Sequence, residues 1–99
     1  MFDIITKKNN NEAVYLLSGE INTITAPKFA EEVDCESANS IVFDFSDVTY
    51  ITSAGIRIIV STAISMDEKG GSFSIRNVPN VINDVFEMTG VYNLVRLEK

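Results

Sequence analysis

The stretch IVFDFSDVTYITSAGIRIIV, residues 41–60, decides the fold of this chain. Residues 40–46 carry apolar side chains on both faces, which is typical of a strand in the middle of a sheet covered by helices. The end of the stretch starts an apolar stripe with helical spacing, formed by Ile56, Ile59, Val60, Ala63 and Ile64. The stretch therefore predicts a buried strand, a connecting loop and a long helix that ends at the cation and glycines of residues 69–71.

The segments on either side of this stretch predict the remaining strands and helices. Residues 2–8 and 14–17 are separated by three asparagines and predict an antiparallel hairpin. A helix follows, with Thr25 offering an N-cap and Pro27 in its first turn. Later come a strand over 72–78, a helix over 81–89 and a last strand over 94–97. The order ββαβαβαβ predicts one α/β domain over residues 1–99, with a mixed, mainly parallel sheet of about five strands, an antiparallel N-terminal strand and helices packed on it.

Composition excludes several classes of function. The formal net charge of −6 argues against nucleic acid and anionic membrane as partners, because both attract basic surfaces. With one cysteine and no histidine, a zinc site of the usual ligands and a histidine-dependent nucleophile are not expected. A single cysteine fits a reducing compartment, and no secretory leader or membrane-spanning run is evident. We expect a soluble cytoplasmic protein without a cofactor.

The sharpest feature is Thr52-Ser53-Ala54-Gly55, between the buried strand and the long helix. Small residues there keep the backbone exposed and let another molecule approach closely. Ser53 has two interpretations. It is an N-cap, which contributes typically about 1 kcal/mol, or it carries a covalent phosphate held near the free N–H groups of the helix start. Residue chemistry alone favours the plain cap, because serine caps are common.

Two acidic residues and a second loop accompany Ser53. Asp44 and Asp47 form either an acidic fringe beside Ser53 or an ordinary strand end and turn. No metal motif, base or phosphate-cradling glycine loop joins these carboxylates, so we expect no enzymatic activity. The polar loop SGEINTITAP, residues 18–27, should emerge at the same sheet edge as Ser53, because both loops follow parallel strands.

Three stretches resemble a known family, the STAS domains of the bacterial anti-sigma factor antagonist type. They are LLSGEINTITAPKF, IVFDFSDVTYITSAGIRIIV and VPNVINDVFEMTGVYNLVRL, at residues 16–29, 41–60 and 78–97. The middle one is the most specific, since family members place a Ser-Ala-Gly type of motif there after an acidic strand and loop.

The resemblance implies a partner-switching function. In this family the unphosphorylated antagonist binds a serine kinase that doubles as an anti-sigma factor, and sigma factor is released. Phosphorylation of the serine before the small residue and glycine breaks the complex, and a PP2C-type phosphatase restores it. Carried over to this chain, Ser53 is the phosphoacceptor. The implied partner surface comprises Asn22, Thr23, Thr25, Asp47, Thr52, Ser53, Ala54, Gly55 and Arg57.

The chain departs from the family pattern at several points. Thr52 stands where many members have Asp and is a rival phosphoacceptor, and Asn22 stands where a second family Asp is found. Many members also add a final helix after the last strand, whereas this sequence ends at Lys99. Two other functions remain open. The fold would serve as a nucleotide or small-anion sensor that uses the helix start at Ser53, or as a scaffold subunit of a larger signalling assembly.

Overall fold

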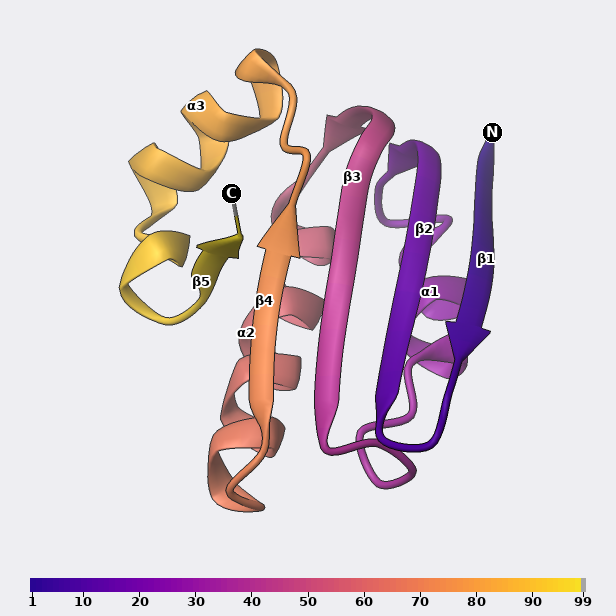
Figure 1. Ribbon diagram of the computed structural model, residues 1–99. Helices are drawn as coiled ribbons and strands as arrows, with labels where there is room; N and C mark the ends of the chain where they lie inside the picture. The colour runs from indigo at the N-terminus through magenta and orange to yellow at the C-terminus, as the bar shows by residue number, and fades with distance from the viewer. Residues whose placement is uncertain (99) are drawn as a thin grey trace.

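The computed structural model describes residues 1–98 and contains one five-stranded sheet with the order β1-β2-β3-β4-β5. β1 runs antiparallel to β2, and the other neighbours are parallel, so the predicted mixed α/β fold is confirmed (Figure 1). The elements are β1 (Phe2–Lys8), β2 (Glu12–Ile21), α1 (Ala26–Glu32), β3 (Ser40–Ile51), α2 (Ser53–Glu68), β4 (Ser72–Arg76), α3 (Asn80–Thr89), a 3-10 helix η1 (Val91–Asn93) and β5 (Arg96–Glu98).

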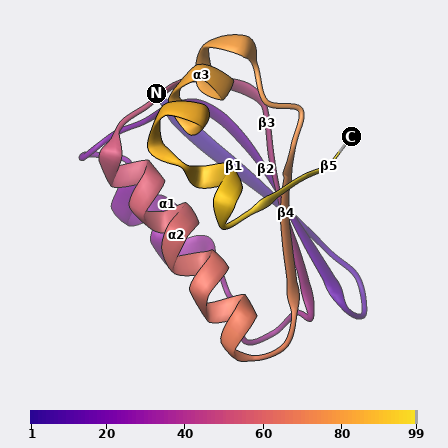
Figure 2. The same cartoon turned by 90° about the vertical axis from the view of Figure 1, so that its left-hand side faces the viewer.

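The helices lie on one face of the sheet, as Figure 2 shows from the side. Within residues 1–98 no helix covers the opposite face of the sheet. Val42 and Asp44 point to that open face, yet they are only 2% and 5% exposed. Their cross-strand neighbours flank them on both sides, with Val14 and Ser74 beside Val42. The apolar pattern of β3 therefore reflects its central place in the sheet.

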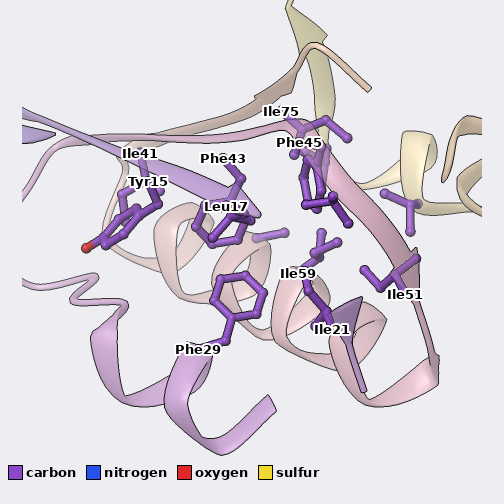
Figure 3. Close-up of a cluster of buried hydrophobic side chains, with 14 of the residues drawn as sticks. Tyr15, Leu17, Ile21, Phe29, Ile41, Phe43, Phe45, Ile51, Ile59 and Ile75 are labelled. Carbon is purple, nitrogen blue, oxygen red and sulfur yellow. The ribbon is translucent and has the colours of Figure 1, made fainter. Parts of the chain in front are cut away.

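The core centres on Phe43, whose side chain is fully buried in the middle of β3. Its ring centroid lies 5.7 Å from Tyr15 of β2, 5.2 Å from Phe29 of α1 and 4.8 Å from Phe73 of β4. These tilted and edge-on contacts are the geometry that aromatic side chains favour. Figure 3 shows Phe43 with Tyr15 and Phe29 among the buried side chains between the sheet and the helices. Phe43 thus packs against side chains of β2, α1 and β4 at once.

Strands β2 and β3 extend further than their apolar patterns predicted. Beyond Ser18 and Asp47 they stay paired up to Ile21 and Ile51, with register shifts on the way. The backbone N–H of Thr52 then donates to the Ile21 carbonyl at 2.9 Å. Asp47, which we expected in a loop, therefore belongs to β3. The bulges break the strict alternation that marks a strand in sequence.

The chain after α3 also differs from the expected strand over residues 94–97. Gly90 ends α3 in the left-handed conformation, with φ 77°. The chain then turns through η1, and β5 begins only at Arg96. The apolar residues Val91 and Val95 point into the core from this turn, with 1% and 4% exposure, rather than from a longer strand.

Asp44 is a buried structural residue, so its interpretation as an acidic fringe beside Ser53 was wrong. Its carboxylate accepts hydrogen bonds from the Ser46 backbone and hydroxyl, from Arg76 Nε at 3.0 Å and from Asn77 Nδ2 at 2.9 Å. Arg76 also lies 3.7 Å from Glu98 of β5. Burial by itself raises the pKa of Asp44, but these hydrogen bonds outweigh it and hold that pKa below its ordinary value. The network ties β3, β4 and β5 together.

Gly55 lets the start of α2 sit directly on the ends of β2 and β3. A Cβ atom at this position would lie 2.6 Å from Ile21 Cγ2 and 2.7 Å from Ile51 Cγ1. Both isoleucines are buried, so neither has free space in which to retreat. The glycine is therefore required by close packing at the edge of the sheet where α2 begins.

We expect Gly55→Ala to lower the free energy of unfolding by about 1–2 kcal/mol, because overpacking outweighs the roughly 1 kcal/mol gained in helix propensity. Urea denaturation followed by circular dichroism measures this. Ser53→Ala, two residues away and exposed, is the matched control and should change stability by less than about 0.5 kcal/mol. A Gly55→Ala protein as stable as the wild type would contradict the close packing.

We expect Asp44→Asn to lower the free energy of unfolding by about 1.5–3 kcal/mol at pH 7, since hydrogen bonds to a charged group are lost. The folded-state pKa of Asp44 lies below its unfolded value. The carboxylate therefore stabilises the fold above the unfolded pKa of about 3.9, and this contribution disappears as pH falls through the folded pKa. Urea denaturation at pH 7 and pH 3 should show the gap between the two proteins shrinking in acid.

The control for this measurement is Asp47→Asn, an exposed position in the same strand. It should leave stability unchanged within about 0.5 kcal/mol at both pH values. A gap between wild type and Asp44→Asn that stays the same at pH 3 would show that the charge of Asp44 contributes nothing.

Candidate functional site

Ser53 is the first residue of α2, and it is exposed. The N-cap position belongs to Thr52, which has extended backbone angles, φ −107° and ψ 179°. The Thr52 carbonyl accepts from the N–H groups of Gly55 at 3.0 Å and Ile56 at 3.1 Å and so closes the first turn. The prediction that Ser53 caps the helix was therefore wrong by one residue. Within residues 1–98 the Ser53 hydroxyl forms no hydrogen bond, so it is not committed to a structural role.

The two candidate hydroxyls at this site differ sharply in accessibility. The Thr52 Oγ1 atom is buried and, among the described residues, has no hydrogen-bond partner. The Ser53 side chain, one residue later, projects into solvent at the helix start. A modifying enzyme must reach the hydroxyl oxygen itself, so the geometry favours Ser53 over Thr52 as a phosphoacceptor.

The loop between β2 and α1 is held in a fixed shape by Asn22 and Thr25. Asn22 Oδ1 accepts from the N–H groups of Ile24 at 2.9 Å and Thr25 at 3.0 Å, which is an Asx turn. Thr25 Oγ1 donates back to the Glu20 carbonyl at 2.9 Å and accepts from the Asn22 N–H at 2.9 Å. Thr25 occupies the N-cap position of α1 as expected, but its hydroxyl stabilises the loop rather than the helix. A neutral Asn22 therefore suffices to build this turn.

Two exposed apolar residues at this edge were missed by sequence reasoning. Ile24 is 87% exposed at the tip of the Asn22 turn, and Tyr50 is 55% exposed near the end of β3. Tyr50 stands opposite Glu20 in the β2–β3 register. One isoleucine in a polar loop has no periodicity to mark it. The signal in the sequence that could have marked Ile24 as exposed was its position between the turn-forming residues Asn22 and Thr25. An aliphatic side chain held out in water by a rigid turn is well placed to anchor a partner.

The structure brings most of the predicted site residues to one edge of the sheet. The Thr52–Ile21 hydrogen bond joins the roots of the two loops. Thr23, Ala54 and Arg57 also line one groove, of about 440 Å³, between α1 and α2. Asp47 is the exception. It lies opposite Ser18, back along β3 from the edge where Ser53 lies.

The chemistry available in the described part of the chain is limited. No three or more His, Cys, Asp or Glu side chains of residues 1–98 are grouped so as to hold a metal ion. Cys35 lines the far end of the groove, and burial together with the charge of Asp34 raises the pKa of its thiol. A thiol with a raised pKa is a poor nucleophile at neutral pH. The arrangement therefore offers a surface for recognition, with the exposed Ser53 hydroxyl at the start of α2.

A helix must be long and apolar to cross a bilayer, and the helices of residues 1–98 were set against that requirement by their own length and composition. None of them reaches it, the longest being α2.

Comparison with known proteins identifies similar chains. The anti-sigma-B factor antagonist of Bacillus subtilis is 25% identical over 95 residues, which cover 94% of this chain and 87% of that protein. An anti-sigma factor antagonist from Mycobacterium paratuberculosis superposes with a TM-score of 0.86 at 23% identity, covering 98% of this chain and 85% of the other. Unphosphorylated SpoIIAA, also an anti-sigma factor antagonist, gives a TM-score of 0.83 at 13% identity, covering 98% and 89%. These two structures share the fold.

The family itself is identified by a sequence model that spans nearly the whole chain. The STAS domain model matches residues 3–99, and that range includes the Asn22 turn, the Ser53 helix start and all the elements of the sheet except the first residue of β1. The matched range, the mixed sheet and the two joined loops agree with one another. This chain belongs to the STAS domain family.

Proposed function

We propose that this protein is a non-enzymatic, cytoplasmic anti-sigma factor antagonist. In its unphosphorylated form it binds a serine kinase that also acts as an anti-sigma factor, and this binding releases the sigma factor. Phosphorylation of Ser53 by that kinase ends the interaction, and a PP2C-type phosphatase reverses it. Membership of the STAS family and the similarity to named anti-sigma factor antagonists support this proposal.

The observation that carries the proposal is the contrast between two adjacent hydroxyls. Ser53 is exposed at the start of α2, whereas Thr52 Oγ1 is buried. The rigid Asn22 turn lies beside Ser53, since the Thr52–Ile21 hydrogen bond joins the two segments. A kinase that grips this turn and the first turn of α2 would hold the Ser53 hydroxyl in its active site. The Asn22 turn and the phosphoacceptor would thus lie within one contact with the kinase.

A phosphate at Ser53 is well suited to end such an interaction. It adds a charge of roughly −1.5 to −2 and three hydrogen-bonding oxygens to a closely fitted surface. Asp44 does not add to the repulsion, because Arg76 neutralises it inside the sheet. The effect comes instead from the volume and the desolvation of the phosphate within the interface. Such a penalty amounts to several kcal/mol, or several orders of magnitude in affinity at about 1.4 kcal/mol per tenfold.

The proposal is tested by incubating the protein with the cognate serine kinase and ATP, then mapping the phosphate by peptide mass spectrometry. We expect stoichiometric phosphate on Ser53, none in Ser53→Ala and unchanged incorporation in Thr52→Val. Thr52→Val keeps the shape of the buried side chain and removes its unpaired hydroxyl, so it also controls for folding. Undiminished incorporation in Ser53→Ala would exclude Ser53 as the phosphoacceptor.

We further expect Ile24→Asp to weaken the binding of the unphosphorylated protein to the kinase by tenfold or more. An exposed apolar anchor is lost, and a charge must be desolvated. Isothermal titration calorimetry with the purified kinase measures this. Ile64→Asp is the matched control, since Ile64 is 51% exposed on the C-terminal half of α2. Equal weakening by both variants would mean that Ile24 has no special part in the interface.

A further inference from the structure

The groove between α1 and α2 is a surface feature that the Ser53 site does not by itself require. It has a volume of about 440 Å³, which is in the range of ligand-binding clefts. Its floor is apolar and includes Ala30 of α1, Val33 directly after α1 and Ile58 of α2. Thr62 adds a methyl group, because its hydroxyl is already bonded to the Ile58 carbonyl at 2.8 Å. The groove is therefore shaped to receive apolar side chains.

Among residues 1–98, Arg57 is the one charged residue that lines this groove. The chain has 14 acidic side chains, yet within residues 1–98 the Arg57 guanidinium forms no salt bridge. Arg57 is exposed, one turn along α2 from Ser53. An unpaired guanidinium beside an apolar floor matches an occupant that carries a carboxylate next to an apolar side chain, since guanidinium and carboxylate bind bidentately.

We propose that this groove is a docking site for an acidic, amphipathic segment of the serine kinase partner. Its apolar side chain would fill the floor near Ala30 and Ile58, and its carboxylate would pair with Arg57. The inference rests on the proposed function and names the chemistry by which that partner is recognised. It also separates recognition from phosphorylation, because the groove extends along α2 away from the Ser53 hydroxyl.

The position of the groove favours this occupant over two others. The groove opens at Thr23 and Ala54, so a kinase that reaches Ser53 already lies over its mouth. A second copy of this chain seated there would cover the same mouth and compete with the kinase. A free fatty acid offers the same apolar and carboxylate chemistry, but in an open surface groove its chain would remain partly in water. Both alternatives are separate outcomes of the test below.

The test fills the groove without touching Ser53 or the Asn22 turn. Ala30→Phe places a ring over the apolar floor, and Ser61→Phe does the same from α2. Glu31→Phe is the matched control, because Glu31 is exposed on α1 and does not line the groove. Affinity for the purified, ADP-bound kinase is measured by calorimetry, after circular dichroism confirms that each variant is folded. We expect at least tenfold weaker binding by both groove variants and less than twofold change in the control.

A second pair of variants tests the charge. We expect Arg57→Glu to weaken kinase binding at least tenfold. Arg57→Lys should weaken it less, because it keeps the positive charge but loses the bidentate geometry. Equal binding by Arg57→Glu and wild type would overturn the proposed pairing with a carboxylate.

The outcomes separate this inference from the proposed function. If wild type is phosphorylated at Ser53 but Ala30→Phe and Ser61→Phe bind the kinase like wild type, the docking site is wrong and the function stands. If the kinase neither binds nor phosphorylates the wild-type protein, both the docking site and the proposed function fail. Saturable binding of sodium decanoate that Ala30→Phe abolishes would assign the groove to an amphiphile instead. A wild-type dimer that Ala30→Phe dissociates would assign it to a second copy.

Discussion

The parallel pairing of β2 with β3 is the constraint on which the rest of the site depends. The two strands stay side by side up to Ile21 and Ile51, and the last link is the hydrogen bond from the Thr52 N–H to the Ile21 carbonyl. The chain leaves both strands at that point, once into the Asn22 turn and once into α2. Polar loops from distant parts of the sequence therefore form one surface because their strands end together.

Close packing then fixes how α2 meets this edge. Gly55 allows the first turn to rest on Ile21 and Ile51, and Thr52 closes that turn through its carbonyl. Ser53 consequently faces solvent while Thr52 Oγ1 is buried. The same seating of α2 beside α1 leaves the groove that contains Arg57. Exposure of the hydroxyl and shape of the groove are thus two results of one packing arrangement.

The order of elements could be predicted because strand and helix periods are local properties of the sequence. The full length of β2 and β3 could not, since bulges break the alternation and only pairing between distant segments restores it. The role of Asp44 was hidden for a similar reason, because Arg76 and Asn77 lie 32 and 33 residues further along the chain. Ser53 was predicted as a phosphoacceptor from the motif around it, and that prediction is untested. Ile24 stood alone in a polar loop, without a periodic pattern to mark it.

In the proposed switch, one phosphate on Ser53 ends binding to the kinase. The most direct measurement is the affinity of the purified kinase for this protein before and after phosphorylation, by calorimetry, with the single phosphate verified by intact mass. We predict a loss of at least a hundredfold, about 2.7 kcal/mol at 25 °C. Equal affinity of the two forms would contradict the switch, even if Ser53 were the residue modified.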